Sequence, residues 1–292
     1  MLAEEKLRAG DVDGALAELK SAVQRNPAEA KYRVFLFQLL AVGGKWNSAL
    51  NQLEIAGELE PINLAMVQAY RQAMQCESLR ERVFAGEASP LIFGQPERWL
   101  ALLLEALKLT AAGQFSQAQG LRGEALEAAP ATSGTLHLSG QRQADFEWLA
   151  DADSRLGPVM EAYLNGQYYW IPLHRIAAVD VEEPADLRDF VWTPAHFTWA
   201  NGGQSVAMIP TRYPGSESES DSLLRLARRT EWRSVGTSDD PQGELFCGLG
   251  QRMLATDREE YALLDVRRLE LQVDSESPEA TEATEQAPGS ES

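Results

Sequence analysis

Hydrophobic residues in the first half of the chain recur with the spacing of amphipathic helices, and this pattern itself repeats. The segments GDVDGALAELKSAVQRNP and GKWNSALNQLEIAGELEP carry matching residue types 34 residues apart. The matched pairs are Gly10 and Gly44, Val12 and Trp46, Ala15 and Ala49, Leu19 and Leu53, Ala22 and Ala56, and Pro27 and Pro61. A period of 34 residues is typical of tetratricopeptide repeats, in which each unit is a pair of antiparallel helices.

A further copy of the repeat, GQFSQAQGLRGEALEAAP, begins at Gly113. It starts 69 residues after Gly44, which leaves room for one degenerate repeat in between. Residues 64–76 and 79–84 have helical spacing and are expected to supply the two helices of that repeat. A single helical hairpin cannot bury its own apolar face, whereas stacked neighbours can. The pattern therefore predicts a short, curved, tetratricopeptide-like helical solenoid over residues 1–130.

The first helices of successive repeats line the concave wall of such a solenoid and form a candidate groove for a partner. The residues expected to face this groove are Lys31, Val34 and Gln38 in the second repeat and Leu100, Leu103 and Leu107 in the fourth. An apolar groove of this kind can receive the apolar face of a partner's amphipathic helix. An alternative stays open, in which the second domain packs against the leucines and covers them.

After Pro130 the period stops, and short strand-like runs separated by turns follow. The expected strands are 159–164, 167–171, 190–199, 205–209, 252–255 and 261–271. Asn165-Gly166 between the first two strands is a strong hairpin signal. One helix is expected at 223–229, with Asp221 or Ser222 as its cap. The chain is thus predicted to have the fold class α + (α+β), with a smaller, mostly antiparallel α+β domain over residues 134–272.

Composition narrows the range of functions. The net charge of −18 disfavours binding to nucleic acid, because phosphate contacts need a basic surface. No run approaches the roughly 20 apolar residues of a membrane helix, and the charged N-terminus disfavours a signal peptide. We therefore expect a cytoplasmic protein without membrane contact. Residues 273–292 hold six acidic residues and no basic one, and are expected to form a disordered acidic tail.

Few residues suggest enzyme chemistry. Asp151 and Asp153, followed by Arg155, could bind a divalent cation or act as an acid/base pair, but no third oxygen ligand follows at loop spacing. No metal-binding spacing relates the three histidines, His137, His174 and His196. We expect no catalytic residue, no cofactor and no metal. A metal-dependent hydrolase in the second domain remains an alternative, and it requires both aspartates to converge with a histidine.

The second domain is rich in tryptophan, tyrosine and arginine, which are favoured anchors at protein interfaces. Adjacent strand residues such as Tyr168 and Tyr169 point to opposite faces, so one face of that strand is expected to be aromatic. The alternative partner-binding residues in this domain are Tyr168, Trp170, Arg212 and Tyr213. Arg212 and Tyr213 precede Pro214-Gly215 and are expected at the surface. For most of the aromatic residues, a role in the core is the competing interpretation.

Several long segments resemble one known family. They are FEWLADADSRLGPVMEAYLNGQYYWIPLHRI, EEPADLRDFVWTPAHFTWANGG, IPTRYPGSESESD, LARRTEW and GQRMLATDREEYALLDVR, with RVFLFQLL and VFAG nearer the N-terminus. In these segments the chain resembles the ImpE/TagJ family of type VI secretion accessory proteins. The resemblance covers almost the whole chain apart from the acidic tail.

The resemblance implies a non-enzymatic adaptor of a contractile secretion machine. Proteins similar to this chain bind the N-terminal helix of the small sheath subunit, TssB, and influence sheath assembly or disassembly by the ClpV ATPase. A TssB-like subunit is therefore the expected direct partner, and ClpV an indirect one. A repeat adaptor for an unrelated partner, such as a chaperone or a regulator, stays open as an alternative.

Overall fold

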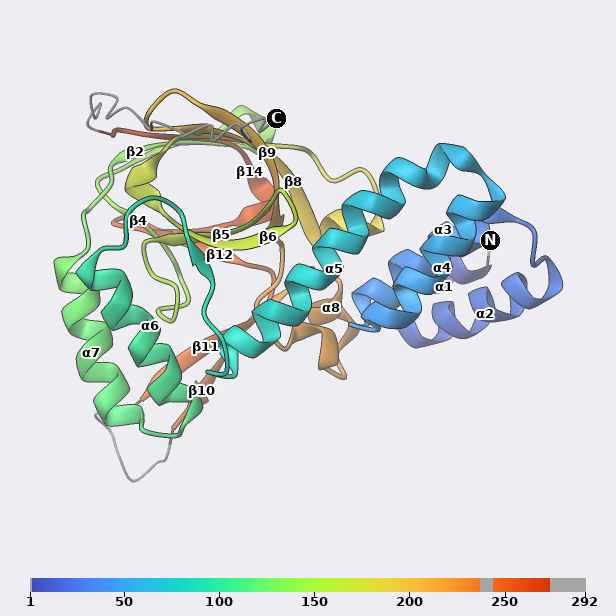
Figure 1. Cartoon of the computed structure of the whole chain (residues 1–292), viewed down its shortest axis with the longest axis horizontal. Helices are drawn as coiled ribbons and strands as arrows, with labels where there is room; N and C mark the ends of the chain where they lie inside the picture. Colours follow the sequence, from blue (N-terminus) through green and yellow to red (C-terminus); the bar gives the residue numbers. More distant parts are fainter. Residues whose placement is uncertain (1, 237–243, 274–292) are drawn as a thin grey trace, which may run out of the picture.

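The computed structural model describes residues 2–236 and 244–273, which form an elongated helical arm attached to a strongly curved β-sheet domain (Figure 1). The helices of the arm are α1 (Leu2–Arg8), α2 (Val12–Arg25), α3 (Ala30–Val42), α4 (Trp46–Leu59) and α5 (Leu64–Phe84). Two further helices, α6 (Arg98–Ala111) and α7 (Phe115–Ala128), precede the main run of strands. The predicted fold class, N-terminal helices followed by a mostly antiparallel α+β domain, is confirmed.

Three of the helix pairs form the hairpins that the 34-residue period predicts, namely α1 with α2, α3 with α4, and α6 with α7. The chain reverses at a glycine in each hairpin, with φ of 83° at Gly10, 63° at Gly44 and 74° at Gly113. Left-handed backbone conformations carry a steric penalty for residues with a Cβ atom, which explains why glycine stands at each of these turns.

The predicted degenerate repeat is different in the structure. Residues 64–76 and 79–84 belong to one continuous helix, α5, rather than to a hairpin. No glycine or proline occurs between Asn63 and Ala85, so nothing in the sequence ends the helix before Gly86. In Figure 1, α5 runs from the upper edge of the arm to the sheet domain and separates the α6–α7 hairpin from helices α1 to α4. The expected continuous stack of hairpins over residues 1–130 is therefore interrupted.

A nine-stranded sheet forms the body of the second domain, with the strand order β1-β6-β5-β9-β8-β7-β14-β2-β3. Its strands are β1 (Leu91–Ile92), β2 (Gly134–Leu138), β3 (Gln143–Phe146), β5 (Val159–Leu164), β6 (Gln167–Pro172), β7 (Ile176–Val181), β8 (Trp192–Trp199), β9 (Gln204–Pro210) and β14 (Val266–Leu271). All neighbouring strands are antiparallel except β1, which pairs parallel with β6. The segment before α6 thus contributes an edge strand to the sheet, a link across the expected domain boundary at residue 130.

Smaller elements complete the domain. They are a three-stranded sheet of β4 (Leu149–Asp151), β12 (Met253–Thr256) and β13 (Glu260–Ala262), a ribbon of β10 (Thr230–Val235) and β11 (Leu245–Gly250), helix α8 (Ser222–Arg225) and the 3-10 turn η4 (Leu187–Phe190). Both predicted hairpins, β5–β6 and β8–β9, are confirmed. The helix expected at 223–229 is shorter than predicted because Ala227 adopts a positive φ of 52°. The strand expected at 261–271 is split into β13 and β14 by a 3-10 turn.

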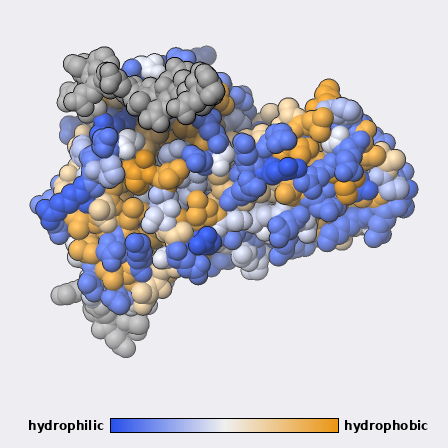
Figure 2. Space-filling model, viewed as in Figure 1, coloured by the Kyte–Doolittle hydropathy of each residue, from blue (hydrophilic) through white to orange (hydrophobic). Residues whose placement is uncertain are grey.

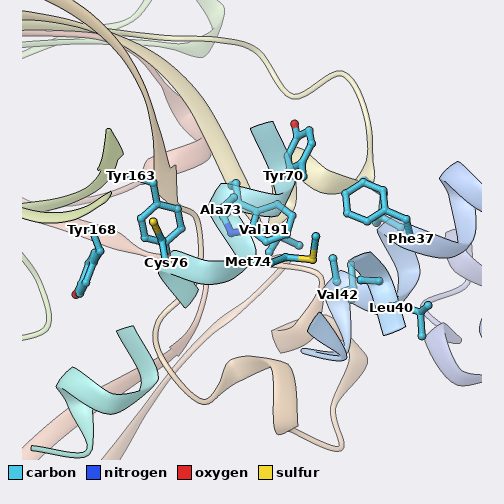
Figure 3. Close-up of a cluster of buried hydrophobic side chains, with 14 of the residues drawn as sticks. Phe37, Leu40, Val42, Tyr70, Ala73, Met74, Cys76, Tyr163, Tyr168 and Val191 are labelled. Atoms are coloured by element: carbon cyan, nitrogen blue, oxygen red, sulfur yellow. The ribbon is translucent and has the colours of Figure 1, made fainter. Parts of the chain in front are cut away.

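Alternation along β5 and β6 divides the interior into two hydrophobic cores. Val159, Tyr163 and Trp170 point to the core shared with the helices, whereas Met160 and Ile171 point to a core between the nine-stranded and three-stranded sheets. Figure 3 shows the first core, in which side chains of α5 lie between tyrosines of the sheet and apolar residues of α3. The arm and the sheet domain therefore share one core.

No described helix is long and apolar enough to span a membrane. The predicted acidic tail lies outside the described residues from position 274 onward.

Candidate functional site

The leucines expected to line an open groove are buried. Leu100, Leu103 and Leu107 on α6 are 1%, 1% and 2% exposed, and they belong to the core that joins the helices to the sheet domain. Because other parts of the molecule cover them, no partner helix can lie on these three side chains in this conformation. The burial of these side chains contradicts the open groove expected on α6.

The groove residues expected on α3 also do not form an open wall. Gln38 is 9% exposed, and Val34 is half-buried. Lys31 is exposed, and its ammonium group lies 3.5 Å from the Glu29 carboxylate. Residues 36–42 of α3 and Ala30 are buried, residues 32–35 are half-buried, and Lys31 is the exposed residue of this helix. Lys31, Val34 and Gln38 therefore do not meet the leucines of α6 in one surface.

Arg212 is buried, which overturns its expected surface position. Its side chain is 4% exposed, and its Nη1 atom donates to the Val42 carbonyl at 2.8 Å. A second donor, Nη2, lies 3.5 Å from the Ala41 carbonyl. The last carbonyls of a helix have no partner within the helix and form the negative end of its dipole. Arg212 thus caps the C-terminus of α3 from the sheet domain, and burial lowers its pKa.

Arg80 of α5 and Glu161 of β5 form the centre of a buried charged network. Arg80 donates to both carboxylate oxygens of Glu161, at 2.8 and 2.9 Å, and also to the Arg212 carbonyl at 2.9 Å. Burial acts to raise the pKa of Glu161, but Arg80 and Arg252 together hold it at about 2. Glu161 is therefore ionised, and its charge is balanced by arginines that come from both parts of the chain.

Arg252 extends this network into the three-stranded sheet. It donates to Glu161, and its Nε atom lies 3.2 Å from an Asp151 carboxylate oxygen, within ion-pair range but without hydrogen-bond alignment. Asp151 also accepts from the Tyr213 hydroxyl at 3.0 Å. Burial raises the pKa of Asp151 to about 7 despite the nearby arginine.

The aromatic residues proposed as surface anchors also belong to this junction. Tyr168 and Trp170 are 1% and 0% exposed. The Trp170 indole donates to the Tyr168 hydroxyl at 2.7 Å, and that hydroxyl donates to Glu161. Tyr213 is fully buried, so its expected surface position is also wrong. Tyrosine and tryptophan in such places supply apolar bulk together with a polar atom that satisfies a buried charge.

The second aspartate of the possible hydrolase motif is held by local partners. Asp153 accepts a forked pair of bonds from Arg155, the shorter at 2.6 Å, and a backbone bond from Gly248 at 2.9 Å. The three histidines are paired with glutamates elsewhere, His137 with Glu270, His174 with Glu97, and His196 with Glu182. Over residues 2–236 and 244–273, no group of three or more histidine, cysteine, aspartate or glutamate side chains could hold a metal ion.

An uncharged surface along α5 was not predicted from the sequence. Leu59, Ile62 and Leu64, at the turn from α4 to α5, are 38%, 86% and 53% exposed. This turn lies at the upper edge of the arm in Figure 1, and Figure 2, in the same view, shows hydrophobic residues in orange there. The signal for this surface is visible in the sequence, since residues 61–70 contain no charged side chain. We call these three residues the arm tip.

A groove of about 240 Å³ lies further along α5, between this helix, the β5–β6 turn and residues within strands β8 and β9. Its walls include Ala69 and Gln72 of α5, Asn165 of the β5–β6 turn, and Val206 and Met208 of β9. Among the described residues no charged side chain lines it, and Val206 is 63% exposed. We call it the α5 groove. The arm tip ends at Leu64, where α5 begins, and Ala69 and Gln72 of the groove follow within the first three turns of α5.

Comparisons with known proteins agree with this architecture. A sequence model described as "ImpE protein" matches residues 143–270. The chain is 48% identical over 272 residues to the "Type VI secretion system accessory component TagJ" of Pseudomonas aeruginosa, covering 93% of this chain and 92% of that protein. A crystal structure of protein VPA1032 from Vibrio parahaemolyticus shares the fold, with a TM-score of 0.82, 22% identity, and coverage of 94% of this chain and 98% of that chain.

The expected family is thus supported by a sequence match that spans both the helical arm and the sheet domain. At this identity and coverage, the arm, the buried junction and the sheet domain are parts of one shared architecture. The chain belongs to the ImpE/TagJ family of type VI secretion accessory proteins.

Proposed function

We propose that this protein is a cytoplasmic, non-enzymatic adaptor of the type VI secretion system. It binds the N-terminal helix of the small sheath subunit, a TssB-like protein, and so influences sheath assembly or disassembly by the ClpV ATPase. The observation that carries this proposal is the 48% identity to an accessory component of that system, over nearly the full length of both chains. Binding rather than chemistry is supported by Asp151 and Asp153, whose carboxylates are engaged by Arg252 and Arg155.

The arm tip and the α5 groove are the proposed docking surface for the helix. Ala65, Ala69 and Gln72 recur at helical spacing on one face of α5, and they connect the exposed Ile62 with the groove. Ala73 lies eleven positions after Ile62, a length of about 16 Å at the helical rise, which suits about three turns of a partner helix. An uncharged surface favours the apolar face of an amphipathic helix, because no charge loses its hydration on binding.

This site replaces the groove expected from the repeat pattern. The leucines of α6 are already buried within the molecule, whereas Ile62, Leu64 and Val206 are exposed. Burial of exposed apolar area is the main source of affinity when an amphipathic helix docks. The docking surface is therefore on the outer side of α5 rather than on a concave wall shared by α3 and α6.

A binding experiment with an isolated peptide tests the proposed function. The full-length protein is titrated with a peptide of the N-terminal helix of the small sheath subunit from the same organism. A scrambled peptide of the same composition serves as the control. We expect binding of the helix peptide in the micromolar range, about 8 kcal/mol, and much weaker binding of the scrambled one. Equal affinity for both peptides, or no binding of either, would contradict the proposal and favour an unrelated partner.

A further inference from the structure

A second cavity, of about 480 Å³, lies between α7 and the β10–β11 ribbon and shares no lining residue with the α5 groove. Two exposed aromatic side chains, Trp232 and Phe246, and two glutamates, Glu244 and Glu260, contribute to its walls, together with Gln119 of α7. Neither the buried charged network nor the α5 groove uses any of these five residues. The cavity is therefore a candidate site that is separate from the α5 groove.

The two aromatic side chains stand on the same face of the ribbon. Trp232 pairs with Gly248, and Ser234 pairs with Phe246, so Trp232 and Phe246 are diagonal neighbours across the two strands. Both remain open to solvent, with exposed fractions of 36% and 51%. The Trp232 ring packs on the buried Tyr213 ring at a centroid distance of 5.6 Å, which holds the indole in place. One wall of the cavity is thus an exposed aromatic surface, with Trp232 held in place by the buried Tyr213 ring.

The carboxylates of the cavity have no cationic partner in the part of the chain that the structure describes. Glu260 and Glu244 form no ion pair with residues 2–236 or 244–273, and no described lysine or arginine lines the cavity. Most other glutamates near the ribbon are paired, as Glu231 and Glu219 are with Arg233. An aromatic wall beside two unpaired carboxylates has the charge pattern that complements a cation.

We propose that this cavity binds the side chain of an arginine carried by a basic peptide of a partner protein. The planar guanidinium stacks on the Trp232 and Phe246 rings while its N–H groups donate to Glu244 or Glu260. The Gln119 side chain supplies a further acceptor from α7. The net charge of −18 attracts a basic peptide from a distance. The proposal does not depend on the sheath helix, because the two surfaces share no residue.

Binding of a defined tripeptide tests this assignment on the full-length protein. The probe is acetyl-Gly-Arg-Gly-amide, and the matched control is the same peptide with citrulline, which is neutral and similar in shape. Indole N–H resonances are followed by NMR at low ionic strength, and the Trp232 signal is assigned with a Trp232→Phe variant. We expect the arginine peptide to shift the Trp232 signal and to bind about ten-fold more tightly than the citrulline peptide.

Substitutions then separate the cavity from the rest of the surface. The double variant with Glu244→Gln and Glu260→Gln should reduce the affinity for the arginine peptide about ten-fold, because it removes both carboxylate charges. Glu58→Gln and Trp148→Leu change an exposed glutamate and an exposed tryptophan outside the cavity and should leave the affinity unchanged. Equal binding of the two peptides, an unshifted Trp232 signal, or unaltered affinity in the double variant would each overturn the assignment.

Discussion

Arg80 of α5 and Glu161 of β5 form a two-pronged ion pair that joins the helical arm to the sheet domain, with both side chains almost completely buried. Glu161 also accepts from Arg252 and Tyr168. A charge removed from water is costly unless it is paired and hydrogen-bonded, and here each oxygen of the carboxylate has at least two donors. The junction is therefore specified by polar contacts as well as by apolar packing.

Removing the carboxylate charge at this junction should be strongly destabilising. Glu161→Gln leaves Arg80 and Arg252 buried near each other without a compensating charge, and we expect the free energy of unfolding to fall by about 3 to 5 kcal/mol. Urea denaturation followed by circular dichroism measures the change. Glu54→Gln, which breaks the half-exposed pair with Arg71, is the control and should cost less than about 1 kcal/mol. A similar loss in the free energy of unfolding in both variants would show that the buried network contributes no more to stability than an exposed ion pair.

Replacement of Arg212 should loosen the arm specifically. Arg212→Met keeps apolar bulk but leaves the Val42 carbonyl and the C-terminus of α3 without their donor, with an expected loss of about 1 to 3 kcal/mol. Amide hydrogen exchange should become faster in α3 and α4, while the β8–β9 hairpin stays protected. A uniform increase in exchange over the whole chain would argue against a local capping role.

The pH dependence of stability should carry a contribution from Asp151. Burial raises its pKa from 3.8 to about 7 in the folded protein, so between these values the folded state binds more protons than the unfolded chain. The contribution of the Asp151 carboxyl to the free energy of unfolding is therefore lost as the pH rises from about 4 to about 7. Glu161 acts in the opposite direction at lower pH, since its folded pKa of about 2 lies below 4.5.

Asp151→Asn removes this proton-binding difference. The variant should lose less stability than the unsubstituted protein between about pH 4 and pH 7, when urea midpoints are compared across that range. Glu77, whose pKa burial also raises, is present in both proteins and cancels in the comparison. Parallel stability curves for the two proteins over this range would refute the assignment of the effect to Asp151.

The two cysteines should react slowly in the folded protein. Burial raises the pKa of Cys76 to about 12 and that of Cys247 to about 11, so little thiolate forms near neutral pH. Alkylation by iodoacetamide at pH 8, followed by mass spectrometry, should label neither thiol quickly, and Cys76 last because it is 3% exposed. Both should react fully in urea. Rapid labelling of Cys76 without denaturant would mean that the α5 junction opens readily.

Local signals in the sequence identify most of the individual elements. The glycines at positions 10, 44 and 113 mark real helix reversals, and Asn165-Gly166 marks a real hairpin turn. The predicted division of residues 64–84 into two helices is wrong, because this segment contains no glycine or proline that would end a helix. Local patterns therefore give the type of an element more reliably than its ends.

Burial at the junction depends on partners that are distant in the sequence. Arg212 donates to the Val42 carbonyl, which lies 170 residues earlier in the sequence. No local pattern predicts such a contact, so the burial of Arg212 could not be predicted. The leucines of α6 have the spacing of an apolar face, but that spacing does not reveal which surface covers them. The uncharged run at 61–70 is the sequence signal for the exposed arm tip, and it is a signal of composition rather than of period.

The proposed function requires that the arm tip and the α5 groove bind a helix of the sheath subunit. Ile62→Glu and Val206→Glu together place two charges on that surface without touching the buried junction, and Leu2→Glu is the matched control on an exposed leucine of α1. We predict that the affinity for the helix peptide falls at least about ten-fold in the double variant and is unchanged in the control, with both proteins folded. Unchanged affinity in the folded double variant would contradict the claim.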